Sequence, residues 1–159
     1  MIRHTVILLA AMSLLVFVSV GCGEDARAES VTSSDSIAEK KDTSKEFTTK
    51  VASAKLKRGA EGQATLTIVA GKGFKWNKEY PAKVTFEGAP KHVTLAKTQL
   101  KQFGGDFKTS DKKADVAIKM TGTATGKETL KAKAKFSVCN DTTCVIREAS
   151  IDVAVNVTK

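Results

Sequence analysis

The sequence predicts an all-β fold, because residues 46–159 repeatedly alternate apolar with polar side chains and contain no stretch with a helical period and caps. The alternation is clearest from Leu130 to Val138 and from Ile151 to Val157. Successive side chains of a strand point to opposite faces, so each apolar set should line a buried face. About seven short antiparallel strands in a segment of this length predict an immunoglobulin-like β-sandwich.

Seven strands are expected in chain order, separated by residues that favour turns. They run from Phe47 to Ala54, Gln63 to Ala70, Ala82 to Phe86, His92 to Ala96, Ala114 to Met120, Glu128 to Val138 and Val145 to Val157. Residues 46–159 have a normal length for one domain with its own core, and a second domain does not fit.

The chain is basic, with 26 Lys and Arg against 17 Asp and Glu and a formal net charge of +9. Such a balance can favour anionic membrane surfaces or acidic partners. The lysines of the predicted strands alternate with apolar residues, so we interpret them as solvated strand faces. Aromatic residues are not interleaved with the basic ones, and we expect no nucleic-acid partner.

Residues 1–22 are typical of a bacterial export signal. Arg3 precedes an apolar run from Thr5 to Val20, which is short for a membrane span. The following Gly21-Cys22 resembles the end of a lipobox, although Ser19 stands where Leu is usual. We expect Cys22 to carry a lipid; simple cleavage and an uncleaved anchor are the alternatives.

Residues 23–45 are rich in Ser, Asp, Glu and Lys and contain no aromatic residue. Such a segment cannot bury enough apolar surface to fold, and we predict a disordered tether. The domain is then expected in the bacterial cell envelope, on the periplasmic side, held to the membrane through a lipid anchor.

With Cys22 assigned to the lipid, Cys139 and Cys144 remain as one pair in an oxidising compartment. They flank the polar turn Asn140-Asp141-Thr142-Thr143 between two predicted strands, and a four-residue hairpin loop places its flanking residues opposite one another. Opposed Cβ atoms lie about 4.5 to 5.5 Å apart, whereas a relaxed disulfide prefers roughly 3.8 Å. A disulfide here is therefore expected to be strained and easily reduced.

Because Cys139 follows Val138, a regular strand turns it away from the core, and we expect an accessible pair unless a bulge reverses its direction. A structural staple is the first alternative, although closing so short a loop stabilises by only roughly 2 kcal/mol. Metal binding by the pair is the second. The only histidines are His4 and His92, so no Cys/His metal centre is expected, and no cofactor.

Two stretches carry a resemblance to a known family. The segment from Ala70 to Pro81 is similar to the glycine-aromatic-x-x-Asn-x-x-Tyr-Pro segment of the N-terminal periplasmic domain of the thiol:disulfide interchange protein DsbD. The segment from Phe136 to Cys144 resembles the redox hairpin of that family. The simplest role of Trp76, Asn77 and Tyr80 is to shape the loop before a strand.

The resemblance implies an immunoglobulin-like fold in which Cys139 and Cys144 shuttle between dithiol and disulfide. The expected partner is a thioredoxin-like periplasmic protein or a transmembrane electron carrier, because the family's membrane and thioredoxin domains do not occur in these 159 residues. In the family an aromatic cap loop shields the disulfide, and Phe103 and Phe107 are the candidates here. The alternative function is a non-enzymatic lipoprotein binding or scaffold domain with a structural disulfide.

Thiol exchange requires an attacking thiolate, which an electropositive and partly exposed environment favours. Lys133, Lys135 and Arg147 lie near the cysteines in sequence and are the expected source of positive charge. Asp141 and Glu148 are positioned to relay protons, but we interpret both as ordinary surface acids.

Overall fold

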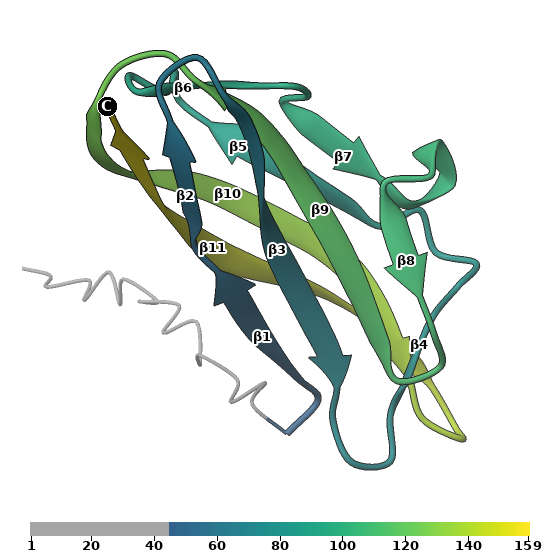
Figure 1. The fold of residues 1–159 in the computed structure, drawn as a ribbon. Coiled ribbons are helices and arrows are strands. Elements are labelled where there is room, and N and C mark those ends of the chain that lie inside the picture. Colours follow the sequence, from purple (N-terminus) through teal and green to yellow (C-terminus); the bar gives the residue numbers. More distant parts are fainter. Residues whose placement is uncertain (1–44) are drawn as a thin grey trace, which may run out of the picture. The chain divides into compact units, whose positions relative to one another are not determined.

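Two β-sheets face each other in residues 45–159, the part of the chain that the computed structural model describes (Figure 1). The first sheet has the order β1 (Phe47–Ala52), β3 (Glu61–Ala70), β9 (Lys113–Gly122) and β6 (Val93–Leu95), and β8 (Phe107–Thr109) also pairs with β9. The second sheet has the order β2 (Ala54–Lys57), β11 (Cys144–Thr158), β10 (Gly126–Cys139), β5 (Lys83–Glu87) and β7 (Gln99–Lys101), and β4 (Lys75–Trp76) pairs with the end of β10.

This arrangement is immunoglobulin-like, and the predicted fold class is confirmed. The order β1, β3, β9, β6 corresponds to strands A, B, E and D of an immunoglobulin domain, while β11, β10 and β5 correspond to G, F and C. A three-residue 3₁₀ helix, η1 (Gln102–Gly104), follows β7. The described residues contain no helix with the length and apolar character needed to cross a membrane.

The single strand predicted from Phe47 to Ala54 is wrong, because the chain changes sheets at Ser53. Strand β1 pairs antiparallel with β3, whereas β2 pairs parallel with the end of β11 in the other sheet. The buried positions accordingly change from odd numbers at Phe47 to even numbers at Ala54 and Leu56. The other predicted strands correspond to β3, β5, β6, β9, β10 and β11. Strands β4, β7 and β8, of two or three residues each, were not predicted.

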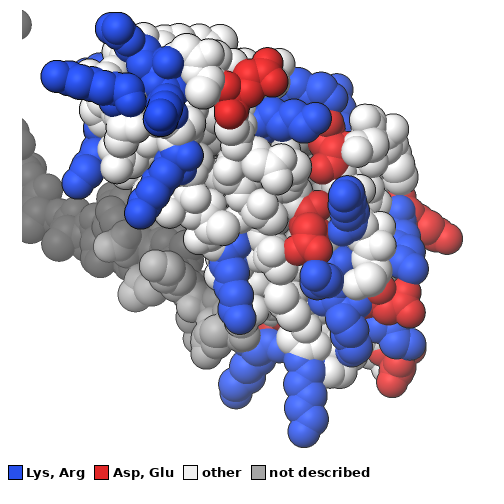
Figure 2. Space-filling view, in the orientation of Figure 1, with Lys and Arg blue, Asp and Glu red and all other residues white. Residues whose placement is uncertain are grey.

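The core lies between the sheets and contains the apolar sets that alternation predicts. Phe136, Val138 and Val153 are completely buried, whereas Lys131 and Lys133 of β10 are exposed on the opposite face. Figure 2 shows Lys and Arg side chains spread over the visible face, with acidic side chains among them. The interpretation of the strand lysines as a solvated face is therefore confirmed for β10.

One end of the core is aromatic. The rings of Phe47 and Phe136 meet edge to face at 4.8 Å, and the indole of Trp76 stacks on Phe136 at 5.4 Å. The ring of Phe107 lies near Trp76 in a tilted arrangement, with the ring centroids 6.3 Å apart. This cluster fixes the position of β4 beside the last residues of β10, where the two cysteines lie.

The beginning of the described chain is held at the same end of the sandwich. Arg147 of β11 donates hydrogen bonds from Nε and Nη2 to the two carboxylate oxygens of Glu46. The backbone N–H of Gly71 donates to the carbonyl of Glu46 at 2.7 Å. A Cβ at Gly71 would lie 2.0 Å from the carbonyl oxygen of Lys45, so this close approach requires glycine.

Candidate functional site

Cys139 is the last residue of β10 and Cys144 the first of β11, and they lie directly opposite one another in the register. Their sulfur atoms are bonded, and their Cα atoms are 3.9 Å apart. The predicted hairpin disulfide is therefore present. Within residues 45–159, no three His, Cys, Asp or Glu side chains are grouped as metal ligands.

Asn140 closes the turn between the two cysteines. Its Oδ1 accepts hydrogen bonds from the backbone N–H groups of Thr142 and Thr143, at 3.0 and 2.8 Å. Its own N–H donates to the carbonyl of Thr143 at 2.9 Å. Asn140 and Thr143 are therefore a hydrogen-bonded pair, and the next pair, Cys139 with Cys144, is of the non-hydrogen-bonded kind, in which side chains lie closest.

The two cysteines differ in accessibility. Cys144 is exposed, whereas Cys139 is half-buried, because Cys139 lies between two strands and Cys144 does not. Both residues belong to the outer face of the second sheet, since Val138 beside them is completely buried in the core. The outward direction predicted from alternation is thus confirmed, and Cys144 is the more exposed residue of the pair.

Lys75 is the cation closest to the disulfide in the sheet register. It lies directly opposite Cys139 on β4, and directly opposed side chains leave the same face of a sheet. The expected cations are instead held in ion pairs: Lys133 with Glu87 at 2.9 Å, Lys135 with Glu148 at 3.3 Å, and Arg147 with Glu46. Sequence reasoning missed Lys75 because β4 has only two residues and pairs with a strand more than sixty positions away.

The two acids considered as proton relays lie at different depths along the hairpin. Asp141 is exposed at the tip of the turn. Glu148 lies four residues beyond Cys144, with its carboxylate in the ion pair with Lys135. Neither arrangement distinguishes these residues from ordinary surface acids.

The two phenylalanines considered for the cap have opposite environments. Phe103, on η1, is 69% exposed and lines a hollow of about 620 Å³ together with Tyr80, Lys83 and Lys135. Phe107 is only 9% exposed and belongs to the aromatic core cluster. Phe103 therefore lies exposed on the surface, whereas Phe107 fills the end of the core.

Gln102 connects η1 to the loop that precedes β5. Its Oε1 accepts a hydrogen bond from Trp76 Nε1 at 2.8 Å, and its Nε2 donates to the carbonyls of Lys78 and Tyr80 at 2.6 and 3.1 Å. Asn77 Oδ1 accepts from the N–H of Glu79 at 3.0 Å, so the predicted role of Asn77 in shaping this loop is confirmed. Phe103 is consequently tied, through Gln102, to the strand beside Cys139.

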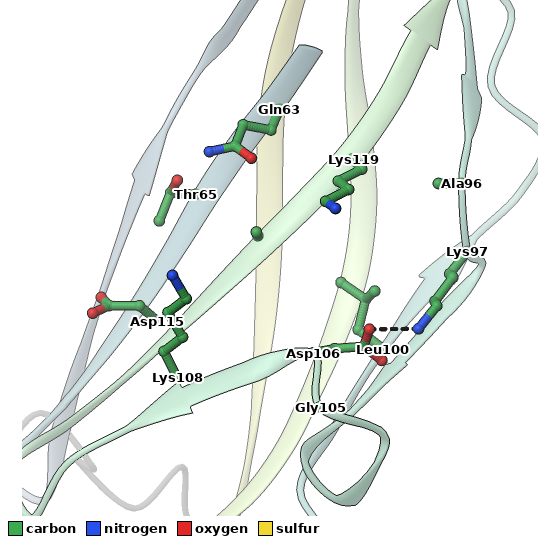
Figure 3. A pocket seen from close by; sticks show the side chains of 11 residues that line it. Gln63, Thr65, Ala96, Lys97, Leu100, Gly105, Asp106, Lys108, Asp115 and Lys119 are labelled. Carbon is green, nitrogen blue, oxygen red and sulfur yellow. Dashed lines mark hydrogen bonds and ion pairs between the residues drawn. The ribbon is translucent and has the colours of Figure 1, made fainter. Parts of the chain in front are cut away.

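A second hollow of about 780 Å³ lies on the other sheet (Figure 3). Its floor consists of outward-facing residues of β3 and β9, including Thr65, Asp115 and Lys119, and its rim carries the ion pair between Lys97 and Asp106 at 2.6 Å. The neighbouring residues of the same strands, such as Val116, are buried in the core. This hollow therefore faces away from the disulfide, which belongs to the outer face of the second sheet.

The carboxylate of Asp106 in this rim should make the stability of the domain depend on pH. Burial raises the pKa of Asp106, but hydrogen bonds from the Lys97 side chain and the Lys101 N–H lower it by more, so its pKa lies below the ordinary 3.8. A carboxylate whose pKa is lower in the folded state than in the unfolded state stabilises the fold at any pH above the unfolded-state pKa. This stabilisation is lost as the pH falls through the folded-state pKa. We expect the stability difference between the wild type and Asp106→Asn to narrow from about pH 5 to about pH 2, as measured by urea unfolding. Asp141→Asn, at the exposed turn, is the control; a difference that stays constant over this range would contradict the prediction.

No model of a known protein family matches this chain, and no curated protein matches it. Matches among solved structures include AggA, the major subunit of aggregative adherence fimbriae type I from Escherichia coli, with 9% identity, a TM-score of 0.37, and coverage of 70% of this chain and 94% of that one. The BIgI domain of the beta protein from S. agalactiae has 12% identity and a TM-score of 0.33, and the match covers 71% of this chain and 99% of that one. Likenesses this low carry no argument about function, and the immunoglobulin-like assignment rests on the strand pairing.

Proposed function

We propose that this protein exchanges dithiols and disulfides with a protein partner through Cys139 and Cys144. The observation that carries the proposal is an exposed cysteine bonded to a half-buried one at the end of a hairpin, with Lys75 opposite the half-buried Cys139 in the strand register. The resemblance to the N-terminal domain of DsbD supports it. The two stretches that carry the resemblance lie side by side, because β4 pairs with Val138 and Cys139.

The arrangement favours one order of attack. A partner thiolate attacks the exposed Sγ of Cys144, the bond between Cys139 and Cys144 breaks, and Cys139 leaves as a thiolate beside the ammonium of Lys75. A second thiol of the partner then attacks the mixed disulfide and releases Cys144. In total the partner loses two electrons and two protons, and this protein gains them as two thiols; the reverse sequence reduces a partner disulfide.

The hairpin has little need of the disulfide as a staple. Strands β10 and β11 pair from Gly126 with Val157 to Cys139 with Cys144, and Asn140 closes the turn with its own hydrogen bonds. A bond that closes so short a loop adds roughly 2 kcal/mol at most in the chain-entropy model. This weakens the alternative of a scaffold domain with a purely structural disulfide.

The partner that fits this chemistry is a thioredoxin-like periplasmic protein or a transmembrane electron carrier. Lipidation at Cys22 and a periplasmic location belong to the same proposal, and both residues 1–22 and the tether, except for Lys45, lie outside the described residues. Of the two cap candidates we retain Phe103, because it is exposed and Gln102 ties it to β4.

The reduction potential of the pair tests the function. We expect the disulfide to equilibrate with thioredoxin-like proteins at a reduction potential above about −300 mV. Structural disulfides of secreted proteins typically have potentials below this value. Cys139→Ser, which keeps the exposed thiol, should form mixed disulfides with such partners more readily than Cys144→Ser. A lower potential together with no adduct from either variant would instead support the scaffold function.

Substitutions of Lys75 and Lys72 form a matched pair for measuring the rate at which the disulfide is reduced. Lys75→Gln should slow reduction of the disulfide severalfold, because the departing Cys139 thiolate loses the cation opposite it in the register. Lys72→Gln, an exposed lysine of the turn before β4 that is not opposite a cysteine, should leave the rate unchanged. Equal rates for both variants would remove Lys75 from the mechanism.

A further inference from the structure

Strand β11 has an open edge that begins at the disulfide. On one side it pairs with β10 along the hairpin, but on the other side β2 pairs with it only from Val155 onward. No other strand within residues 45–159 pairs with that side between Cys144 and Ala154. The open edge is therefore about 35 Å long at the usual rise of a strand.

The backbone groups that face this edge follow from the register. Because Cys139 and Cys144 are a non-hydrogen-bonded pair, the N–H and C=O of Cys144 point away from β10, as do those of Ile146, Glu148 and Ser150. One contact agrees with this direction: the guanidinium of Arg147 donates from Nη1 to the carbonyl oxygen of Ile146 at 2.8 Å. The edge thus presents donors and acceptors at the two-residue spacing of an unpaired strand.

Resting on the proposed function, we propose that this edge binds an extended, cysteine-bearing segment of the redox partner as an added strand. Backbone groups at this spacing are recognised by another extended backbone. A cysteine paired directly with Cys144 would have its Cβ about 4.5 to 5.5 Å from that of Cys144, close enough for the sulfurs to exchange. The pairing therefore selects which cysteine of the partner reacts.

Ile146 adds a side-chain preference. Its side chain is 53% exposed on the same face as Cys144, and it is one of two large apolar side chains exposed in the described residues. In an antiparallel added strand, the residue opposite Ile146 lies two positions before the cysteine. The preferred segment therefore has an apolar residue at that position.

Two features keep the edge from binding strands indiscriminately. Arg147 occupies the carbonyl of Ile146, so an added strand must replace that hydrogen bond while Glu46 holds the guanidinium through Nε and Nη2. The outward acids Glu148 and Asp152 are already paired with Lys135 and Lys131, at 3.3 and 3.4 Å. Recognition thus depends on the backbone more than on charge.

The test uses the full chain carrying Cys139→Ser, whose Cys144 thiolate attacks an activated peptide disulfide and releases the coloured 2-nitro-5-thiobenzoate anion. The probe is an eight-residue peptide with valine two positions before its activated cysteine. We expect N-methylation of the peptide amides that face the edge to slow release roughly tenfold, the loss of one or two hydrogen bonds. Equal rates for the methylated and unmethylated peptides would overturn the proposal.

A protein variant gives the complementary measurement. The N–H of Ile146 makes no ladder hydrogen bond, so Ile146→Pro should keep the hairpin while it removes one edge donor. The variant should slow the reaction with the peptide severalfold. The rate with activated glutathione, which is too short to pair as a strand, should stay unchanged. Equal slowing of the reactions with both probes would refute the docking of a peptide strand. So would a dimer of the parent protein that Ile146→Pro dissociates without any change in the rate of reaction with the peptide.

The two proposals fail separately. If the wild-type disulfide does not exchange with thioredoxin-like proteins while the peptide rates still depend on N-methylation, the redox function is wrong and the edge site stands. If exchange occurs but N-methylation has no effect, the function stands and the edge site is wrong.

Discussion

Replacing Phe136 with alanine is expected to lower the free energy of unfolding by about 4 kcal/mol, the largest effect of any single change considered for this protein. Phe136 is completely buried and contacts both Phe47 of the first sheet and Trp76 of β4. Its removal leaves a cavity between the sheets and removes the ring contacts that Phe136 makes with Phe47 and Trp76. Urea unfolding followed by tryptophan fluorescence measures the change, because Trp76 is the only tryptophan of the chain.

Thr129→Ala is the matched control for Phe136→Ala, since Thr129 is exposed on the same strand. Surface substitutions of this kind change stability by within about 0.5 kcal/mol. A loss of less than about 1 kcal/mol for Phe136→Ala would mean that the aromatic cluster does not support this end of the core.

Replacing Arg147 with alanine is expected to cost about 2 to 3 kcal/mol, toward the low end for breaking a buried ion pair. The side chains of Arg147 and Glu46 are only 18% and 12% exposed, so the remaining carboxylate would be poorly solvated. The hydrogen bond with Glu46 also raises the pKa of Arg147 above its ordinary value, which keeps the guanidinium charged. The variant also loses the bond from Nη1 to the carbonyl of Ile146.

A double-mutant cycle separates the pair from its surroundings. Glu46→Ala combined with Arg147→Ala should cost less than the sum of the two single changes, by about 1 to 3 kcal/mol. Lys131→Ala breaks an exposed pair with Asp152 and should have little effect on stability. If Arg147→Ala is no more harmful than Lys131→Ala, the contact between the sheets at Glu46 contributes nothing.

The sequence indicated those parts of the site that depend on neighbouring residues. Alternation placed Val138 in the core and Cys139 on the opposite face, and the turn residues brought Cys144 opposite Cys139. Lys75 and the pair of Arg147 with Glu46 depend on contacts across the sandwich, and no local pattern reports such contacts. The change of sheet at Ser53 was partly visible, because the apolar positions shift from Phe47 and Val51 to Ala54 and Leu56. A single-strand interpretation ignored that shift in register.

Phe103 and Phe107 also show that local sequence does not reveal tertiary packing. Phe103 and Phe107 lie in one glycine-rich segment and have the same side chain, yet one is exposed and the other is packed against Trp76. The difference arises because Phe107 belongs to β8, which pairs with β9, whereas Phe103 lies on η1 outside both sheets. Sequence alone identified the pair of candidates, and tertiary packing distinguished them.

The contact between Glu46 and Arg147 also sets where the described chain enters the domain. The described residues begin at the end of the sandwich that carries the disulfide, because Glu46 pairs with Arg147, three residues along β11 from Cys144. If Cys22 carries a lipid, as proposed, the tether joins the domain at the end that carries the disulfide, and we expect the hairpin to stay within the tether's reach of the membrane. Attachment at the opposite end would move the hairpin away by the length of β11, about 50 Å. Attachment at this end would keep the sulfurs within the reach of the tether from the bilayer, where a membrane-embedded electron carrier would meet them.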